Sequence, residues 1–236
     1  LRGFYTFGDM YLDGIRDTAQ YNREVFNLEQ VDVLRGSAAM LFGRGQAGGV
    51  INQVSKTPML YGINKAGVGI GTNGFQEVKA DINQRIGEST AVRVNVMNRD
   101  EGSARSNPYT GTEPEIHRSG VAPSISFGLG TPHEVTLSHL WVKTRDNADY
   151  GIPFVNRRPN EAMAKAGNYY GVDAGFDNSD TNVTTASYLH TIAPNTQWRT
   201  VLRKANYKRS YWAVAGQGAL TAASTRRSSA NGSCAS

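Results

Sequence analysis

The sequence predicts a small α+β unit over residues 1–57 followed by antiparallel transmembrane β-strands, and three observations lead to this fold class. The first 57 residues combine many glycines with short strand-like runs such as VDVLRG. After residue 60, segments of about ten residues alternate apolar with small or polar side chains, the period of strands whose two sides face different solvents. Short and long connections alternate between these segments, as they do in transmembrane barrels.

A glycine-rich stretch in the first unit, LFGRGQAGGVINQVSK over residues 41–56, has the G-x-G-x-x-G spacing of a dinucleotide-binding loop. Such a loop follows a strand and opens a helix. Here the order is reversed, because Ser37 is a candidate N-cap for a helical turn over residues 38–42 and the β-branched run from Val50 predicts a strand afterwards. No acidic residue that could read a ribose occurs between residues 57 and 75. A nucleotide-dependent soluble enzyme is therefore a weak alternative, and the glycines need another explanation.

The second unit extends over residues 62–212 and consists of amphipathic strands. In AVRVNVMN, residues 91–98, the three valines share one face, whereas Arg93 and Asn95 take the other. Because an Arg or Lys that faces lipid at the bilayer midplane costs about 2–4 kcal/mol, we expect Arg93 and Lys79 to face a wet interior.

The connections favour a transmembrane barrel over a soluble sandwich, which would show the same side-chain alternation. The tight turns are GEST at 87–90, GTPH at 130–133 and APNT at 193–196. Longer polar connections lie at about 101–115 and about 147–181, and the short TNG at 72–74 is the exception. The strand EVTLSHLWVK has apolar residues on both faces, so its lipid side stays open.

Composition excludes several kinds of site. The chain of 236 residues has one cysteine, Cys234, and four scattered histidines, so we expect neither a disulfide framework nor a metal centre. Its net charge of +5 is spread without a basic run, which argues against nucleic acid as a partner. No apolar run approaches the roughly 18 residues of a membrane-spanning helix. No nucleophile stands at a suggestive spacing from a base, so no catalytic residue is expected.

The last part of the chain, residues 213–236, is rich in Ser, Ala and Gly and predicts an unstructured tail. About seven strands precede it. The chain begins at Leu1 without a charged and apolar leader, so we expect either that a leader has been removed or that the chain is a fragment.

The stretch FYTFGDMYLDGIRDTAQYNREVFNLEQVDVLRGSAAMLFGRGQAGGVINQVSK resembles the C-terminal half of the plug domain of TonB-dependent outer-membrane siderophore receptors. The resemblance implies a plug fragment over residues 1–57, followed by part of a 22-stranded β-barrel, a size class whose lumen takes a plug. In this context the glycines of the opening stretch are backbone turns of the plug. These turn glycines are Gly43, Gly45, Gly48 and Gly49.

The same resemblance implies function and location. A ferric siderophore would be the transported ligand, with no covalently bound cofactor, in the bacterial outer membrane and in contact with its lipid. The TonB complex would supply the work by pulling on a box ahead of the plug, and that box is absent from this chain. We therefore expect a truncated or frame-disrupted product that does not transport by itself. A passive pore or adhesin barrel, or a receptor for cobalamin, haem or a sugar, remains an alternative.

Ligand contacts are implied at two places. In similar receptors GIRDTAQYNR lies at the outward apex of the plug, which implies Arg16, Tyr21 and Arg23. The segments ADYGIPFVNRRPN and NYYGVD look like the region after the fifth barrel strand in catecholate-type receptors, and their arginines and aromatic rings suit an anionic, aromatic ferric chelate. A solvated loop that merely contains aromatic residues is the alternative. The residues implied in this second region are Tyr150, Arg157, Arg158, Tyr169 and Tyr170.

Four charged residues of the signature, Glu29, Asp32, Arg35 and Arg44, could suggest acid–base chemistry. Structural ion pairs are the better interpretation, because similar plugs use such pairs to lock onto the barrel wall. We therefore expect these residues to form plug–barrel ion pairs.

Overall fold

The computed structural model consists of β-sheets, and its described residues contain no helix long and apolar enough to cross a membrane. The structure describes residues 10–34, 49–147, 149, 151, 154–155, 158–159, 161, 167–171, 173–214 and 225–235. A four-stranded sheet is built from the N-terminal residues, an eight-stranded sheet from most of the rest, and a two-stranded hairpin lies in a long connection.

The small sheet has the strand order β2-β1-β4-β3, with β1 parallel to β4 and the other pairs antiparallel. Its strands are β1 (Met10–Leu12), β2 (Ile15–Arg16), β3 (Leu28–Leu34) and β4 (Val50–Ser55). Strands β3 and β4 confirm the strands predicted in VDVLRG and after the glycine-rich stretch. The β1–β2 hairpin turns through Asp13 and Gly14, both at positive φ, as a type I′ turn requires.

Of the predicted turn glycines, only one lies among the described residues. Gly49 has a φ of 111°, a conformation that L side chains rarely adopt, and it leads directly into β4. This φ favours glycine at the position, and its role as a backbone turn of the plug stays a prediction. The other glycines, Gly43, Gly45 and Gly48, lie outside the described residues, as do Ser37 and the helical turn predicted over 38–42.

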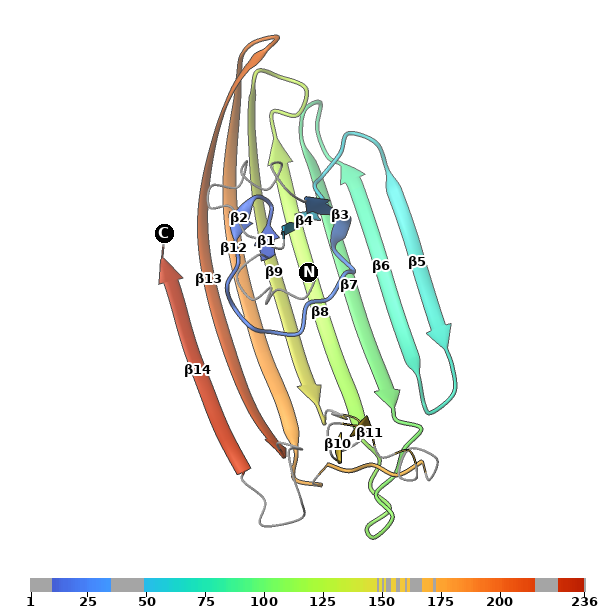
Figure 1. The fold of residues 1–236 in the computed structure, drawn as a ribbon. Coiled ribbons are helices and arrows are strands. Elements are labelled where there is room, and N and C mark those ends of the chain that lie inside the picture. Colours follow the sequence, from blue (N-terminus) through green and yellow to red (C-terminus); the bar gives the residue numbers. More distant parts are fainter. Residues whose placement is uncertain are drawn as a thin grey trace.

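The large sheet is an antiparallel meander in which each strand pairs with the next along the chain. Its strands are β5 (Ile63–Ile70), β6 (Gln76–Arg85), β7 (Ala91–Gly102), β8 (Glu115–Phe127), β9 (His133–Asp146), β12 (Phe176–Ala193), β13 (Thr196–Val214) and β14 (Thr225–Ala235). Figure 1 shows these long strands side by side, with the small sheet against one face of the large one. We call the large sheet the wall and residues 10–34 and 49–57 the N-terminal unit.

The connections follow the predicted alternation. Tight turns between strands lie at the upper end of the wall in Figure 1, and the long connections lie at the lower end with the β10 (Phe154–Val155) and β11 (Arg158–Pro159) hairpin. The short connection between β5 and β6 is at the lower end, as the predicted exception. One end of the wall therefore has only short turns, and the other carries most of the loop residues.

The two faces of the wall differ as predicted. Arg93 and Asn95 are buried toward the N-terminal unit, whereas Val94 on the opposite face is exposed. Lys79 shares the inner face with buried Asp81 and pairs with Glu77, so it faces inward as expected. The exposed large apolar residues of the outer face include Val68, Val78, Ile82, Phe127, Leu137, Trp198 and Leu202.

The ambiguous strand β9 is resolved by what packs against it. Leu140 and Val142 face inward, where they join a cluster around Phe26 of the N-terminal unit, and Leu137 faces outward. The inner face of β9 is apolar at this point because it receives an aromatic side chain from the small unit. The apolar residues on both faces of β9 are therefore explained, because one face contacts Phe26 and the other is the outer face of the wall.

The prediction of an unstructured tail over residues 213–236 is wrong for the residues that the structure describes there. Strand β13 continues to Val214, and β14 pairs with it from Thr225 to Ala235. Edge strands present a row of backbone N–H and C=O groups, and main-chain pairing with such an edge does not need an alternating side-chain pattern. The low-complexity sequence therefore concealed a strand.

Candidate functional site at the interface of the two sheets

The inner face of the wall holds the N-terminal unit through arginines on three strands. Arg93 of β7 donates two hydrogen bonds of 2.8 Å to the carboxylate of Asp81, and its Nη1 donates to the carbonyl of Thr57 at 2.9 Å. Lys56 of the unit lies 3.1 Å from the same carboxylate. Glu29 of the unit approaches Arg93 at 3.6 Å. Charged groups of the wall are thus paired with charged groups of the unit. Such pairing offsets the desolvation that burial imposes on them.

A second cluster surrounds Arg118 of β8. Its Nη1 donates to Glu24 of the N-terminal unit at 2.8 Å, and its Nη2 donates to Asp146 of β9 at 2.7 Å. Asn22 donates a further hydrogen bond of 3.0 Å to Asp146. The side chains of Glu24 and Asp146 are 9% and 2% exposed, so this guanidinium is the cation that compensates two buried carboxylates.

Strand β13 supplies two further arginines. Arg203 donates to the carbonyl of Leu12 at 2.8 Å and to Asp13 at 3.2 Å, both in the β1–β2 hairpin. Arg209 forms a two-pronged pair with Asp177 of β12, at 2.8 and 2.6 Å. The forked pair of Arg209 has a fixed geometry and joins β13 to β12 within the wall, whereas Arg203 holds the hairpin against the wall.

An apolar contact complements these charges. Phe26 is 7% exposed and packs against Met97, Ala122 and Val142 of the wall. A Cβ added to Gly120 would lie 2.6 Å from a ring carbon of Phe26, so the glycine is the floor of this socket. The interface therefore combines one aromatic anchor with several charged clamps.

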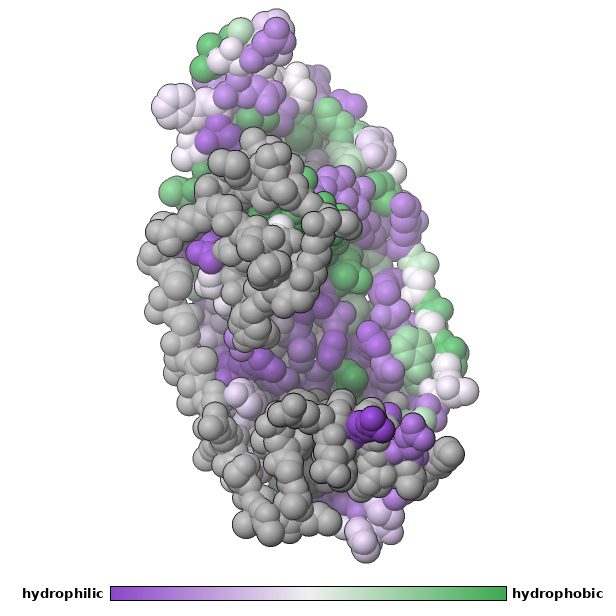
Figure 2. Space-filling view, viewed as in Figure 1, coloured by the Kyte–Doolittle hydropathy of each residue, from purple (hydrophilic) through white to green (hydrophobic). Residues whose placement is uncertain are grey.

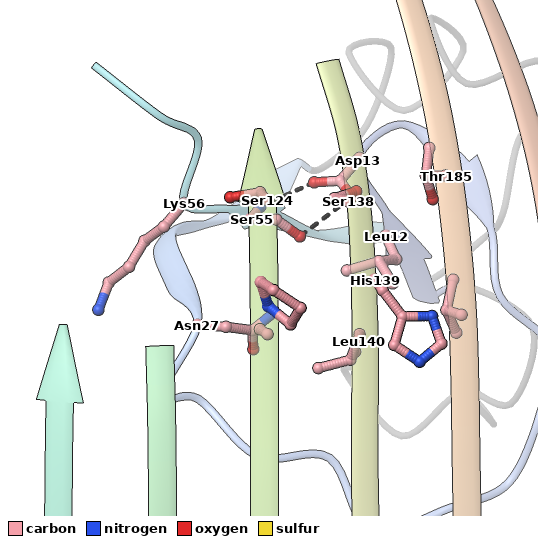
Figure 3. A pocket seen from close by; sticks show the side chains of 13 residues that line it. Leu12, Asp13, Asn27, Ser55, Lys56, Ser124, Ser138, His139, Leu140 and Thr185 are labelled. Atoms are coloured by element: carbon pink, nitrogen blue, oxygen red, sulfur yellow. Dashed lines mark hydrogen bonds between the residues drawn. The ribbon is translucent and has the colours of Figure 1, made fainter. Parts of the chain in front are cut away.

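A small cavity lies between the anchor and the hairpin clamp. It is about 30 Å³ in volume, which is room for about two water molecules. Figure 3 shows Asp13, Ser55 and Asn27 of the N-terminal unit on one side, with side chains of β8, β9 and β12 on the other. Ser55 donates two hydrogen bonds to Asp13, at 2.7 and 3.0 Å. The wall side combines apolar side chains with the hydroxyls of Ser124, Ser138 and Thr185.

Two of the three residues predicted at the apex of the unit, Tyr21 and Arg23, lie together in an internal network. The hydroxyl of Tyr21 donates to Asp17 at 2.8 Å, and Arg23 donates to the same carboxylate at 2.6 Å. The Tyr21 ring stacks on Tyr207 of β13, with centroids 5.1 Å apart. Burial, and then the Asp17 carboxylate, raise the pKa of the Tyr21 hydroxyl above its ordinary value. Arg16 is exposed in β2. Ligand contact by these residues stays a prediction.

The residues predicted in the long connections differ in how far they are buried. Tyr169 is 3% exposed, and its hydroxyl donates to Asn147 at 2.9 Å while its backbone N–H donates to Ser106 at 2.8 Å. Arg158 is exposed in β11, and Tyr170 is half-buried. The long connection after β7 and that after β9 are thus joined through Tyr169, which favours a structural role for this ring. Tyr150 and Arg157 lie outside the described residues.

The predicted ion pairs are supported in one case. Glu29 contacts Arg93 of the wall, as expected. Asp32 instead accepts hydrogen bonds from Gln30 and Asn52, so the partners that the structure describes for it lie within the small sheet. Arg35 and Arg44 lie outside the described residues.

Sequence reasoning missed most partners at this interface, including the clamp of Arg118 and the socket at Gly120. The signal that could have identified Arg118 was already used for Arg93: a cation in an amphipathic strand should face away from lipid. Its partners Glu24 and Asp146 could not have been identified in this way, because they depend on docking and register.

Comparison with known proteins adds the family context. Residues 1–50 match the family model described as TonB-dependent Receptor Plug Domain. The chain is 36% identical over 224 residues to the catecholate siderophore receptor Fiu of Escherichia coli O157:H7, covering 89% of this chain and 29% of that protein. It is 36% identical over 217 residues to the probable TonB-dependent siderophore receptor PiuA of Acinetobacter baumannii, covering 89% of this chain and 28% of that protein.

Solved structures agree with these relatives. The open form of the ferric-catecholate import receptor Fiu from E. coli K12 has a TM-score of 0.81 at 32% identity and covers 98% of this chain and 38% of that one. The siderophore receptor PiuA from A. baumannii has a TM-score of 0.80 at 33% identity and covers 91% of this chain and 31% of that one. The chain spans about 29% of the length of the first curated relative it matches.

Proposed function

Because the chain belongs to the TonB-dependent siderophore receptors, we propose that it acts as part of a receptor that imports a ferric siderophore across the outer membrane. The observation that carries the proposal is a wall with an apolar outer face, whose inner face holds a folded unit by paired charges, such as Lys56 with Asp81 and Glu24 with Arg118. Proteins of this family are outer-membrane proteins, and a unit docked inside the wall suits a gated carrier better than an open pore. The N-terminal unit is the plug of this receptor.

The complete wall in this proposal is a closed barrel of 22 strands. The eight strands described here leave β5 and β14 as edges. Unpaired edges are not tolerated in lipid, so further strands must pair there. A barrel of about 22 strands has a lumen wide enough to require a plug. By itself the chain should therefore not transport.

The proposed ligand is a ferric chelate of the catecholate class, since the relatives named above include catecholate receptors. Such a chelate is anionic and aromatic, and exposed Arg16 and Arg158 together with Tyr170 are the proposed contacts among the described residues. No covalently bound cofactor and no enzymatic reaction form part of the proposal.

The work for release comes from the TonB complex in this proposal. A receptor that binds its ligand at nanomolar concentration holds it with roughly −12 kcal/mol, so spontaneous escape is slow. The plug adds a second barrier, because its ion pairs with Arg93, Arg118 and Arg203 of the wall must break before the lumen opens. Mechanical work on the plug would lower both the barrier to ligand release and the barrier to opening of the lumen.

A chimera tests the proposal directly. In it, this chain replaces the matching segment of the E. coli receptor Fiu, and the chimera is expressed in a strain without catecholate receptors of its own. We expect growth on a ferric catecholate as sole iron source, and no growth when TonB is deleted from the same strain. A chimera that is present in the outer membrane yet supports growth only with cobalamin or haem would contradict the assigned ligand. Growth without TonB would point to a passive pore.

A further inference from the structure

Strand register brings together two of the four histidines that are scattered along the sequence. His133 begins β9 and His190 lies near the end of β12, and the two residues stand directly opposite each other. The backbone N–H of Thr191 donates to the carbonyl of Pro132 at 2.8 Å, so the adjoining histidine pair is of the non-hydrogen-bonded kind. Side chains approach each other more closely in such pairs. The two imidazole rings are stacked, with centroids 4.3 Å apart.

The histidine pair lies on the outer face of the wall, at the end that carries the tight turns. Along β9 the side chain of His133 points in the same direction as that of Leu137, which is exposed on the outer face. His133 is itself exposed, and His190 is half-buried. The tip of β12 and β13 projects at the upper end of Figure 2, where hydrophilic and hydrophobic residues are mixed. A dissolved ion can therefore reach the pair.

A tyrosine hydroxyl orients one of the two rings. Nδ1 of His133 lies 2.8 Å from the hydroxyl oxygen of Tyr188, which shares a face of β12 with His190. When Nδ1 carries the proton and donates it to this oxygen, the lone pair of Nε2 is free to bind a metal ion. Histidines that bind metals almost always donate their other ring N–H to an oxygen acceptor, which fixes the orientation of the ring. Tyr188 provides that acceptor.

Two imidazoles at this separation suit one transition-metal ion. Imidazole nitrogens bind zinc at about 2.0–2.1 Å, so two of them on one ion lie about 3 Å apart. The outer torsion of a histidine side chain is broad, and a modest rotation of the stacked rings brings two nitrogens to that separation. In the part of the chain that the structure describes, no third His, Cys, Asp or Glu joins the pair, so water would fill the remaining positions.

An aromatic girdle alone does not account for the pair. Aromatic residues flank the apolar band of transmembrane barrels, which explains Tyr188 and also Trp198, the residue opposite His190 on β13. A girdle does not require two neighbouring imidazoles. Imidazole is, however, a side chain that Zn²⁺, Cu²⁺ and Ni²⁺ favour as a ligand.

We propose that His133 and His190 form a binding site for a divalent transition-metal ion, with Tyr188 as the residue that positions His133. Cu²⁺ is the tightest ligand of the site, because nitrogen sites bind it more strongly than the other divalent ions of its row. The bound ion bridges β9 and β12 beside their tight turns. The proposal rests on strand register and ring geometry, and is independent of the proposed transport function.

The test uses the complete chimeric receptor described above, purified without a polyhistidine tag and titrated with Cu²⁺ alone. Electron paramagnetic resonance reports how many nitrogens bind the ion. His133→Gln with His190→Gln should remove a signal with two nitrogen ligands, seen in the difference spectrum against the unsubstituted receptor. Tyr188→Phe should keep the site but weaken Cu²⁺ binding about tenfold. The matched control, His117→Gln with His139→Gln, removes the other two histidines of the chain and should leave the signal unchanged.

Each outcome bears on the histidine pair. An unchanged copper signal after His133→Gln with His190→Gln overturns the proposal. An equal loss in the control variant also overturns it, and indicates scattered binding by surface histidines. An unchanged affinity in Tyr188→Phe overturns the positioning role of that hydroxyl. Growth on the ferric catecholate, measured in the same variants without added copper, should match the unsubstituted chimera and reports separately on transport and correct folding.

Discussion

Replacement of Arg118 by Gln would remove the cation from a site that holds two buried carboxylates. The Arg118 side chain is 18% exposed, and those of Glu24 and Asp146 are 9% and 2% exposed. Removing one partner of a fully buried pair costs about 3–5 kcal/mol, because the remaining charge stays desolvated. The partial exposure of the guanidinium puts our expectation at the lower end, about 3 kcal/mol. That value corresponds to roughly a 150-fold rise in the undocked fraction of the N-terminal unit.

Hydrogen exchange at the β4 amides, Val50–Ser55, in the complete chimeric receptor reports opening of the small sheet, which docking against the wall opposes. Arg118→Gln should accelerate exchange by about two orders of magnitude, and Arg118→Lys should fall between it and the unsubstituted receptor because it keeps charge without the fork. Arg145→Gln is the matched control, since it breaks an exposed pair worth about 0–1 kcal/mol. A double-mutant cycle of Arg118→Gln with Glu24→Gln isolates the wall–unit coupling. Coupling below about 0.5 kcal/mol would refute the clamp.

Three further outcomes follow from the same interface. Gly120→Ala should displace the Phe26 ring and destabilise docking. Phe26→Ala should cost about 3–5 kcal/mol, and Gly120→Ala should add little to that cost when the two are combined. Denaturant titrations of the unsubstituted receptor, the two single variants and the double variant measure this. The pKa of Tyr21 is raised, so its stabilising contribution is present below its ordinary value near 10 and falls as pH rises above it; Tyr21→Phe should flatten this loss in alkaline unfolding curves. Gly49→Ala should cost about 1 kcal/mol or more in thermal unfolding, because its φ is 111°.

The faces of the strands could be predicted because their cause is local. The alternation around Arg93 is contained in residues 91–98, and the cost of a lipid-facing cation assigns its direction without knowledge of any partner. The same holds for the inward position of Lys79 and for the strand that begins at Val50. Each of these depends on a few consecutive residues and on the solvent beside them.

The candidate site could be predicted only in outline. Glu29 was expected to pair with the wall, but nothing local names Arg93 as its partner, 64 residues away in sequence. The role of Tyr169 also depends on a distant segment, because its partner Ser106 lies in another connection. The predicted tail concealed β14, whose partner is the backbone edge of β13. Register and edge pairing are therefore the steps that the sequence pattern does not contain.

The sequence by itself determined that the chain forms amphipathic strands with a wet and an apolar side, joined alternately by tight turns and long loops, after a glycine-rich unit. Tertiary structure alone decided that Phe26 enters an apolar socket over Gly120 and that Arg118 compensates Glu24 and Asp146. The physical reason is range. A period of two is set by neighbours along the chain, whereas the partner of a buried charge or ring is set by strand register and docking, which bring distant segments together.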